Sequence, residues 1–444
     1  MARRAHVGGG PSGRVPRGLA NEARWAEILE AAATVFDEKG YKAATLHEVA
    51  ASVGLLPGSL YYYIRSKEDL LFALVEGAHA QGVAATAEDE VTAAAEAPER
   101  LRSFVQRWMV VLEATAPLGA VESNMAFLAD EHRRRVHERR RHLHAFVRGI
   151  VAQGIAEGAF DPAAHPGVVT NSLFAVLTGT RTWASPDGRL TYAEIGDWYV
   201  RLHVRGLARP ARRRAAAAAP RTAGGARPGA LPAVPQATAA TTSTPHDVRW
   251  EEILDAAAEE FRVAGFKAAR LHDIAARVGL LTGSLYHYLS SKEELLHALM
   301  RDAHQQAIDR VVDAVVPEAP ADQQLAALIR AWAVLPPPPR HDIVERDVRF
   351  LTPPHRRAIE ELRLRLHELA RGVVVAGIAD GTFASDLDPG VATCSLTSIL
   401  NGTRTWWRPS GQLSAGELHE WYATFFRRGF GPAGPRAGAG RREG

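Results

Sequence analysis

The side chains best suited to contacting a nucleic acid lie in one short segment near the N-terminus. It reads Pro57-Gly-Ser-Leu-Tyr-Tyr-Tyr63, and Lys67 follows four residues later. Small residues at the start of such a segment let the backbone approach a base edge, and Tyr62 is able to point away from a core. Hydroxyl and ammonium groups donate hydrogen bonds to phosphate oxygens, which suits Tyr63, Lys67 and, upstream, Thr45. The chemistry indicated is contact with DNA.

Short helices and a glycine turn must hold this segment in place. Thr45-Leu-His-Glu48 is a capping box that predicts the start of a short helix, and Gly54 predicts a tight turn with a left-handed residue. Residues 57–64 predict a third helix, and Ser66 predicts the start of a fourth. A longer helix precedes them and is predicted to end at Gly40. A short helix, a glycine turn and a second short helix form the pattern of a helix-turn-helix.

The whole arrangement occurs twice. Leu55-Leu-Pro-Gly-Ser-Leu-Tyr-Tyr-Tyr63 returns as Leu280-Leu-Thr-Gly-Ser-Leu-Tyr-His-Tyr288 at an offset of 225 residues, and Gly179-Thr-Arg-Thr-Trp183 returns as Gly402-Thr-Arg-Thr-Trp406 at an offset of 223. A period this long is a duplicated pair of domains, because solenoid repeats are only ~20–45 residues long. Residues 100–208 and their counterparts predict longer apolar helices, and no useful strand pattern occurs. The predicted fold class is all-α, with two tandem helix-turn-helix heads, each followed by a larger helical domain.

Composition and charge narrow the class of protein. The chain has 444 residues, of which 46% are hydrophobic and 23% charged, as in an ordinary globular protein. No stretch is apolar enough to cross a membrane, and residues 1–24 lack the apolar core of a signal peptide. Cys394 is the only cysteine, so an internal disulfide and a cysteine-based zinc site are excluded. We expect no other metal site, no cofactor and a cytoplasmic location. Positive charge gathers at residues 1–24, 209–249 and 427–444, which indicates an anionic partner.

The spacing of these residues resembles the DNA-binding head of TetR-family transcriptional regulators. The resemblance is carried by Gly40-Tyr41, Thr45-Leu-His-Glu-Val-Ala50, Gly54-Leu55, Gly58-Ser-Leu-Tyr-Tyr-Tyr63 and Ser66-Lys67-Glu68. It implies that base edges are read by Pro57, Gly58, Ser59 and Tyr62, and that phosphates are held by Thr45, Tyr63 and Lys67. In the second copy the corresponding DNA-binding residues are Arg270, Thr282, Gly283, Ser284, His287, Tyr288 and Lys292.

The two heads differ where the difference would matter for DNA. Three positions change from the first copy to the second: Thr45 to Arg270, Pro57 to Thr282 and Tyr62 to His287. The first change removes a helix cap worth ~1 kcal/mol but could add a phosphate contact. If both heads bind DNA, their half-sites should differ, which makes the operator an imperfect palindrome. One property opposes DNA binding, since residues 25–75 and 250–300 each carry a net charge of −3.

The larger helical domains contain an arginine within apolar helices. Such an arginine needs a carboxylate or an anionic ligand, and Glu122 and Glu345 are the candidate partners of Arg181 and Arg404. This part resembles the TetR regulators of fatty-acid and steroid breakdown, whose effectors are acyl-coenzyme A thioesters. The resemblance implies a small apolar or acyl-CoA-like effector, bound by Trp108, Phe127, Arg181, Trp183, Trp332, Phe350, Arg404 and Trp406. Pro336–Pro339 must break a helix in the second copy.

These features divide the chain into seven parts. They are a basic disordered arm (1–21), a first head (22–76), its ligand-binding and dimerisation domain (77–208), an Ala/Pro-rich linker (209–246), a second head (247–301), its ligand-binding and dimerisation domain (302–430) and a disordered tail (431–444). By family resemblance, the last two helices of each copy form a four-helix interface. A flexible 38-residue linker spans ~31–37 Å, close to the ~34–36 Å between half-sites one turn apart. We therefore expect the copies to pair as a pseudo-dimer within one chain, with further dimerisation left open.

The predicted function is that of a sequence-specific DNA-binding transcriptional regulator, a repressor that its ligand releases from DNA. The alternative is a ligand-binding or interaction protein of the same fold in which one or both heads have lost DNA binding. An enzyme is not expected, because the chain has no nucleophile motif, no metal-ligand spacing on one helix face and no phosphate-binding glycine loop.

Overall fold

The computed structural model describes residues 19–84, 86, 93, 95–115, 125–185, 187–209, 245–333 and 348–432. Every regular element among these residues is a helix, which confirms the all-α prediction. None of the described helices combines the length and the apolar character needed to cross a bilayer. Most of the predicted arm, linker and tail lies outside the described residues, so the predicted domain boundaries remain predictions.

The chain divides into two compact units, and each is described by itself. The first unit comprises residues 1–153 and 180–197, and the second comprises residues 154–179 and 198–444. The second unit therefore holds the whole second copy together with two helical segments of the first copy.

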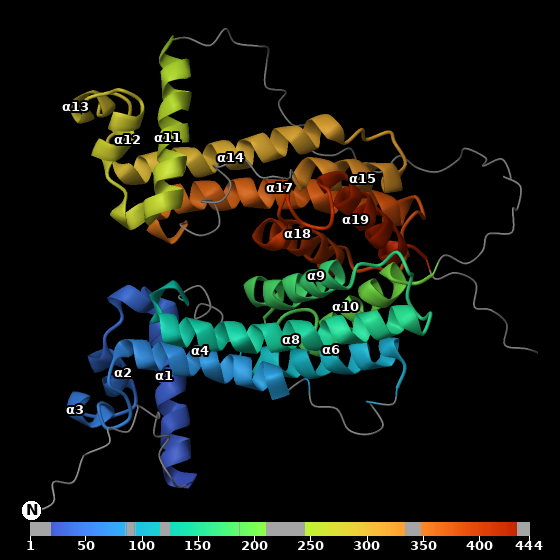
Figure 1. The fold of residues 1–444 in the computed structure, drawn as a ribbon, viewed down its shortest axis with the longest axis horizontal. Coiled ribbons are helices and arrows are strands. Elements are labelled where there is room, and N and C mark those ends of the chain that lie inside the picture. The colour runs from blue at the N-terminus through green and yellow to red at the C-terminus, as the bar shows by residue number, and fades with distance from the viewer. Residues whose placement is uncertain are drawn as a thin grey trace, which may run out of the picture. The chain divides into compact units, whose positions relative to one another are not determined.

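The first head is a helix-turn-helix built on a long first helix (Figure 1). Its helices are α1 (Leu19–Ala43), α2 (Leu46–Ser52), α3 (Pro57–Leu60) and α4 (Lys67–Ala84). Ile28 and Phe36 of α1 form one buried cluster with Val49 of α2 and Leu60 of α3. Burial of each such side chain contributes ~1.5–3 kcal/mol, so the apolar stripe of α1 is what fixes the two short helices. Gly40, at φ 76°, interrupts α1 near the predicted helix end.

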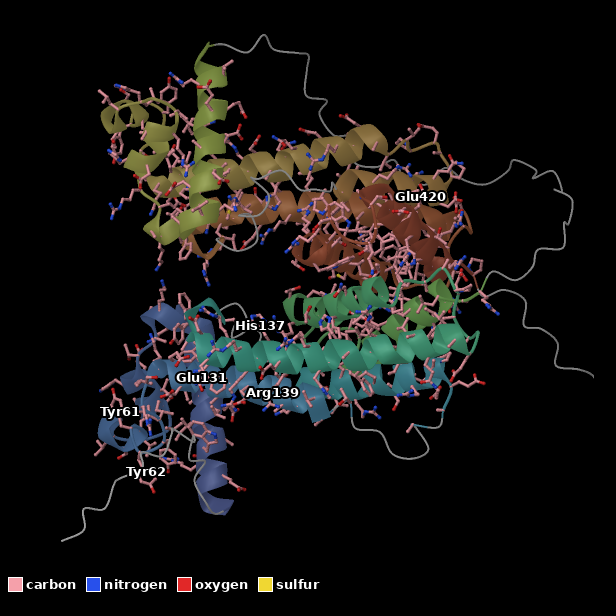
Figure 2. The ribbon with its side chains drawn as sticks, in the orientation of Figure 1. Tyr61, Tyr62, Glu131, His137, Arg139 and Glu420 are labelled. Carbon is pink, nitrogen blue, oxygen red and sulfur yellow. The ribbon has the colours of Figure 1, made fainter. Side chains whose placement is uncertain are left out.

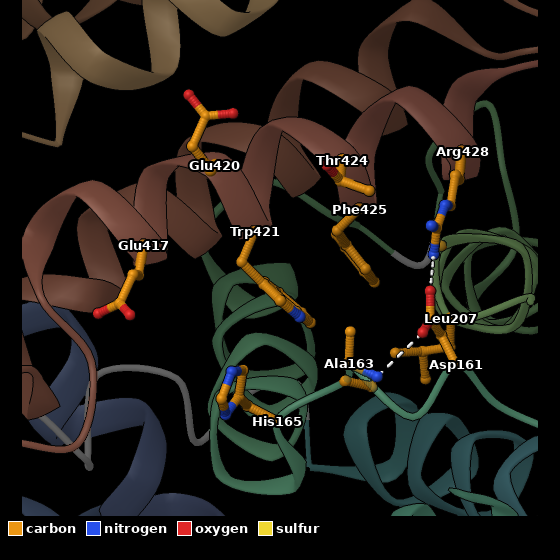
Figure 3. A pocket seen from close by; sticks show the side chains of 12 residues that line it. Asp161, Ala163, His165, Leu207, Glu417, Glu420, Trp421, Thr424, Phe425 and Arg428 are labelled. Carbon is orange, nitrogen blue, oxygen red and sulfur yellow. Dashed lines mark hydrogen bonds and ion pairs between the residues drawn. The ribbon is translucent and has the colours of Figure 1, made fainter. Parts of the chain in front are cut away.

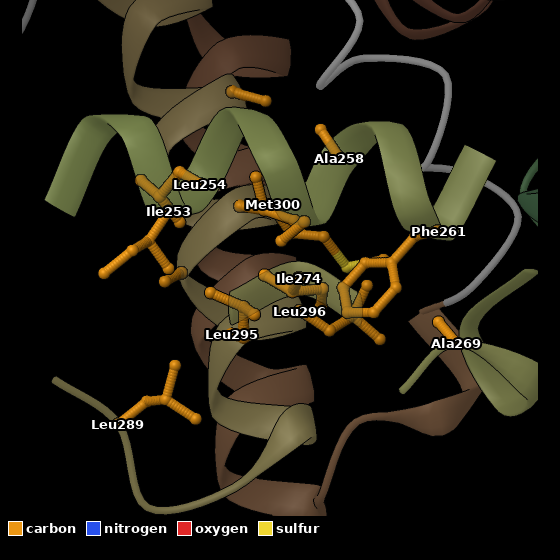
Figure 4. Packing of buried hydrophobic residues seen from close by; sticks show 14 of the residues in the cluster. Ile253, Leu254, Ala258, Phe261, Ala269, Ile274, Leu289, Leu295, Leu296 and Met300 are labelled. Carbon is orange, nitrogen blue, oxygen red and sulfur yellow. The ribbon is translucent and has the colours of Figure 1, made fainter. Parts of the chain in front are cut away.

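The second head repeats this plan. Its helices are α11 (Pro245–Ala268), α12 (Leu271–Arg277), α13 (Thr282–Leu285) and α14 (Lys292–Ala314). Figure 4 shows Phe261 of α11 gathered with Ile274 of α12 and Met300 of α14 in one apolar cluster.

Each head is followed by longer helices. In the first copy they are α6 (Ala97–Ala114), α8 (Asp130–Ala156), α9 (Pro166–Gly179) and α10 (Tyr192–Gly206), with short turns η2 (Met125–Phe127) and η3 (Thr180–Thr182). In the second copy they are α15 (Ala321–Trp332), α17 (Pro353–Ala379), α18 (Pro389–Trp406) and α19 (Ala415–Phe430), with the turn η4 (Val348–Phe350).

Two helices are shorter than their counterparts or predictions suggest. A third helix was expected over residues 57–64, but α3 ends at Leu60, because the N–H groups of Tyr62 and Tyr63 bond to carbonyls only three residues back. In the second copy α15 ends at Trp332, whereas α6 continues to Ala114, six residues beyond Trp108. The proline run that predicts this shortening, Pro336–Pro339, lies outside the described residues.

Candidate nucleic-acid interface and effector-binding helices

A helix cap and a left-handed glycine set the turn between α2 and α3. Thr45 Oγ1 accepts the N–H of Glu48 at 3.3 Å, and the Glu48 carboxylate accepts the N–H of Thr45 at 2.9 Å, which completes the predicted capping box. Gly54 has φ 66°, a region that residues with a Cβ enter only with strain. The N–H of Leu55 then closes the turn on the carbonyl of Ala50 at 2.8 Å. These local bonds aim α3 outward from the head.

Large side chains stand out from the tip of each head, which comprises residues 56–62 in the first head and 281–287 in the second; Figure 2 labels Tyr61 and Tyr62. Tyr62 is 80% exposed and Tyr61 57% exposed in the first head. In the second head Leu281 is 80% exposed, Tyr286 is 57% exposed and His287 is also exposed. Apolar side chains of this size are usually covered, and their gathering at one tip is typical of a surface that meets a macromolecule.

The residues predicted to read bases all lie on these tips. They are Pro57, Gly58, Ser59 and Tyr62 in the first head and Thr282, Gly283, Ser284 and His287 in the second. Sequence reasoning missed Leu56 and Tyr61, with their counterparts Leu281 and Tyr286. The sequence could not single them out, because the helix predicted over residues 57–64 had room for more than one buried side chain. In the structure α3 and α13 have four residues each and bury only Leu60 or Leu285.

Tyr63 and Tyr288 lie at the edge of each core rather than at the tip. The ring of Tyr63 stacks on Trp25 with ring centroids 6.4 Å apart, and Tyr288 packs against the core of the second head. Each ring is partly buried, so it can present a hydroxyl to solvent while the ring anchors the segment.

Lys67 and Lys292 occupy equivalent positions in the two heads and donate hydrogen bonds to the end of the preceding long helix. Lys67 Nζ donates to the carbonyls of Tyr41 at 2.7 Å, Lys42 at 3.1 Å and Ala44 at 2.8 Å, and it lies 4.6 Å from the centre of the Tyr41 ring. An ammonium has three donors, and all three are used here. Lys292 likewise donates to the carbonyls of Lys267 and Ala269. Both lysines therefore fasten the end of the first helix of their head. The phosphate contact expected of Lys67 and Lys292 stays a prediction.

The position before the second helix differs most between the heads. In the first head Glu48 bonds to Thr45 and also pairs with Lys39 at 2.6 Å, and the hydrogen bond from Lys39, with those from Thr45, lowers the pKa of Glu48 to about 2. In the second head Arg270 replaces Thr45 and makes no capping bond. Its guanidinium is exposed and has no hydrogen bond or ion pair within the part of the chain that the structure describes.

Phe127 and Phe350, predicted to line an effector site, lie against the heads instead. Phe127 stacks on Tyr41 with centroids 5.2 Å apart, and Phe350 stacks on Phe266 at the same distance. Both belong to the apolar packing of the head cores. The sequence could not reveal this, because η2 and η4 are distant in sequence from the head residues that they contact, and only the folded chain brings them together.

Glu68 and Glu293 join each head to the helix after this turn. Glu68 accepts the N–H of Ala129 at 2.9 Å and contacts His132 Nδ1 at 2.7 Å, next to the start of α8. Glu293 contacts Thr352 N at 2.8 Å and His355 Nδ1 at 2.9 Å, at the start of α17. Glu68, Asp69 and His132 lie close enough to hold a metal, but helix capping explains why these carboxylates gather there.

The remaining predicted effector residues lie in or beside the longer helices. Trp108 and Trp332 are buried, and Trp183 and Trp406 are partly buried. Arg181 donates to the carbonyl and hydroxyl of Thr115, each at 2.8 Å, and Arg404 donates to the carbonyl of Trp332 at 3.0 Å. Both arginines thus reach the C-terminal end of a helix, where a cation is favoured. Their expected partners, Glu122 and Glu345, lie outside the described residues.

Within the second unit, α9 and α10 of the first copy pack on α18 and α19 of the second. A Cβ added to Gly206 would lie 2.5 Å from the ring of Phe425, and one added to Gly429 would lie 2.5 Å from Leu202. Gly179 meets Ser398 in the same way, so the helices approach closely where side chains are absent. His203, fully buried, lies edge-on to Phe425 with centroids 5.3 Å apart.

Comparison with known proteins assigns the chain to a family. The family model described as "Bacterial regulatory proteins, tetR family" matches residues 28–74 and 253–299. The model described as "Tetracyclin repressor-like, C-terminal domain" matches residues 94–207 and 318–430.

Individual relatives match about one copy each. The HTH-type transcriptional repressor KstR2 of Rhodococcus jostii is 30% identical over 177 residues, which cover 39% of this chain and 87% of that protein. The fatty acid metabolism regulator protein of Bacillus subtilis is 24% identical over 41% of this chain and 95% of that protein. The solved structure of the ketosteroid transcriptional regulator KstR2 of Mycobacterium tuberculosis is 24% identical, with a TM-score of 0.38, over 44% of this chain and all of that one. Both family models match this chain twice, and the chain therefore belongs to the TetR family of bacterial transcriptional regulators, with two such units in tandem.

Proposed function

We propose that this regulator reads DNA with both of its heads from a single chain, on an operator made of two different half-sites. The observation that carries the proposal is the exposed tip of each head. Tyr61 and Tyr62 in the first head, and Tyr286 and His287 in the second, are exposed and do not belong to the core of their head. In a helix-turn-helix this is the part that enters the major groove. The protein would act in the cytoplasm, where its operator is.

The two half-sites should differ because the two tips differ. Tyr62 offers a ring and one hydroxyl, whereas His287 offers two ring nitrogens, and Pro57 is replaced by Thr282. Gly58, Ser59, Gly283 and Ser284 would let each backbone approach the bases. We assign phosphate contacts to Arg270, Tyr63 and Tyr288, and give Thr45 a lesser part because its hydroxyl already donates to Glu48 at 2.9 Å.

Close packing of the last two helices supports pairing of the copies within one chain. Gly206 against Phe425 and Gly429 against Leu202 are equivalent positions at the offset of 223, as expected for an approximate twofold axis. The linker adds a high effective concentration, which favours the partner on the same chain over one on another chain.

Two ion pairs between the copies disfavour the pairing of two second copies. Asp161 pairs with Arg428, and Asp386 pairs with Arg201, each at 2.7 Å. At the offset of 223 the counterpart of Asp161 is Ala384 and that of Asp386 is Ala163. Two first copies would leave Arg201 facing Ala163 but would keep Asp161 facing Arg205, the counterpart of Arg428. Two second copies would leave Arg428 facing Ala384 and Asp386 facing Thr424, so they would keep neither pair. An exposed pair contributes only ~0–1 kcal/mol, so this charge pattern selects the partner more than it adds stability.

The effector is proposed to be a small apolar molecule or acyl-CoA thioester that lowers DNA affinity by favouring another arrangement of the heads. The residues retained for it are Trp108, Arg181, Trp183, Trp332, Arg404 and Trp406, without Phe127 and Phe350. Binding should appear as a thermal shift with acyl-CoA thioesters and as release of bound DNA at the same concentrations. A thermal shift without release would reject the regulatory role of that ligand.

Selection of bound sequences from a random DNA library tests the proposal directly. The full chain should enrich an imperfect palindrome, Tyr62→Ala should relax base preference in one half, and His287→Ala should relax it in the other. Val110→Ala, which shortens an exposed side chain on α6, is the control and should leave the motif unchanged.

The alternative function is a ligand-binding protein whose heads no longer bind DNA. The net charge of −3 on each head favours it. It predicts no enriched sequence in the selection, and only salt-sensitive background binding through the arginine-rich segments.

A further inference from the structure

A cavity of about 320 Å³ lies between the copies within the second unit (Figure 3). Trp421 and Phe425 of α19 form its aromatic wall, with Thr424 beside them and Ala163 opposite. The Trp421 and Phe425 rings stack with centroids 5.1 Å apart. This volume is at the lower end of the range for small-molecule sites.

The charges around the cavity are mainly negative. Asp161, Glu417 and Glu420 line it, against Arg428 as the one cationic lining residue, with His165 beside them. Arg428 is already bound to Asp161 at 2.7 Å and to the carbonyl of Ala208 at 3.2 Å, so its charge is neutralised locally. Asp161 is likewise neutralised by Arg428, and Glu420 lies 3.9 Å from Arg330, so Glu417 is the carboxylate that adds negative charge to the cavity. An aromatic face has a negative quadrupole, so the wall of Trp421 and Phe425 attracts a cation beside Glu417.

The duplication provides an internal comparison, because the same place exists on the other side of the approximate twofold axis. The counterpart of Trp421 is Trp198, that of Thr424 is Arg201 and that of Ala163 is Asp386. There the Arg201 guanidinium lies 4.1 Å from the Trp198 ring centre and is held by Asp386 at 2.7 Å. On this side of the interface, the guanidinium of Arg201 therefore covers the indole of Trp198.

On the other side both members of that pair are missing. Threonine and alanine occupy the positions of the arginine and the aspartate, and the space beside Trp421 is a cavity. We propose that this cavity binds a small organic cation with a guanidinium head, which takes over Trp421 the place that Arg201 occupies over Trp198. The planar, weakly hydrated guanidinium suits stacking on an indole better than an ammonium does.

This proposal stands apart from the DNA-binding function, since it depends only on contacts within the second unit. The site lies at the junction of the copies, so its occupation would stabilise the paired state by mass action.

Isothermal titration of the full chain with n-butylguanidinium tests the proposal, with the uncharged n-butylurea as the matched probe. We expect saturable binding of one cation per chain and at least tenfold weaker binding of the urea. A blocked arginine amide is titrated in parallel. Tighter binding of the arginine amide than of n-butylguanidinium would indicate an arginine side chain of a peptide as the ligand, and tighter binding of n-butylguanidinium would indicate a free small molecule.

Two sets of substitutions use the internal comparison. Thr424→Arg with Ala163→Asp copies the filled side into the empty one and should abolish binding while raising the melting temperature. Arg201→Thr with Asp386→Ala, made together with Ala384→Asp so that Arg205 is neutralised as Arg428 is, opens the equivalent site over Trp198 and should raise the stoichiometry from one to two. Trp421→Leu should weaken binding at least tenfold, whereas Trp198→Leu should not.

Absence of saturable binding by the folded wild-type chain would overturn the proposal. So would equal affinity for the guanidinium and the urea, or binding that persists unchanged in the Thr424→Arg, Ala163→Asp variant. The Thr424→Arg, Ala163→Asp variant keeps the test decisive if Trp421→Leu fails to fold.

Discussion

Single side chains decide which part of each head can meet DNA and which part holds the head together. Lys67 has the charge expected of a phosphate contact, yet its three donors are used on the carbonyls of Tyr41, Lys42 and Ala44. Sequence alone could place Lys67 at the start of a helix, but it could not show that the end of the preceding long helix lies within reach of its ammonium.

Replacing Lys67 tests this structural role. Lys67→Met should destabilise the first head by about 1–3 kcal/mol, because it leaves three carbonyls without a charged donor. The salt dependence of DNA binding should stay the same. The measurements are the denaturation curve and the slope of log affinity against log salt, with exposed Arg65→Met as the control. Unchanged stability together with a slope reduced by about one would restore the phosphate contact.

His203 makes the packing between the copies sensitive to pH. Burial lowers the pKa of His203 to about 4 from an ordinary value of 6.5, although the Tyr199 carbonyl partly opposes the shift. The unfolded chain takes up a proton near pH 6.5 and the folded chain only near pH 4, so stability falls as pH falls through this window. The loss from this residue is at most about 3 kcal/mol.

His203→Phe copies Phe426, the residue at the equivalent position of the second copy. Between pH 6.5 and 4 its melting temperature should fall less steeply than that of the wild type. An identical pH profile for both proteins would show that His203 is not the group responsible.

A helix cap and two glycine turns were predicted accurately from sequence, because their signals are local, whereas the end of α3 was not. The capping box at Thr45 and the left-handed glycines Gly54 and Gly40 lie where expected. The turns η2 and η4 were not predictable in this way, since the position of Phe127 or Phe350 against a head depends on contacts between distant segments. The same reason explains why Arg181 bonds to the end of α6 at Thr115, a contact that no spacing in the sequence indicates.

The start of the second helix offers an exchange between the two heads. Arg270→Thr should restore a cap and stabilise the second head by up to about 1 kcal/mol. It should also reduce the salt slope of operator binding by about one, because one phosphate contact is lost. Thr45→Arg in the first head is the matched reverse change, with a loss of stability expected. If Arg270→Thr gains stability but keeps the full salt slope, Arg270 does not contact a phosphate.

At the scale of the whole molecule, pairing of the copies depends on residues that lack side chains. Gly206→Ala should loosen the contact of α10 with α19, because the new Cβ would lie 2.5 Å from the Phe425 ring and 3.0 Å from its carbonyl oxygen. We expect at least a tenfold loss of affinity for a full operator, with little change for an isolated half-site. Gly149→Ala, in a helix with open space around it, is the control and should bind as the wild type does. Equal losses on the full site and the half-site would place the defect in a head instead.

The duplication was evident from sequence, but the partner choice was not. The offset of 223 makes the two copies look interchangeable, and only the packing of the second unit brings Asp161 next to Arg428 and Asp386 next to Arg201. Both acidic residues have alanine as their counterpart, and this difference has meaning only once the opposing helix is known.

The central claim is that one chain reads one complete operator. Native mass spectrometry of the full chain with its selected DNA measures this directly. The account predicts one chain per duplex, on a site whose two halves differ and respond separately to Tyr62→Ala and His287→Ala. Two chains on a site with identical halves would contradict it.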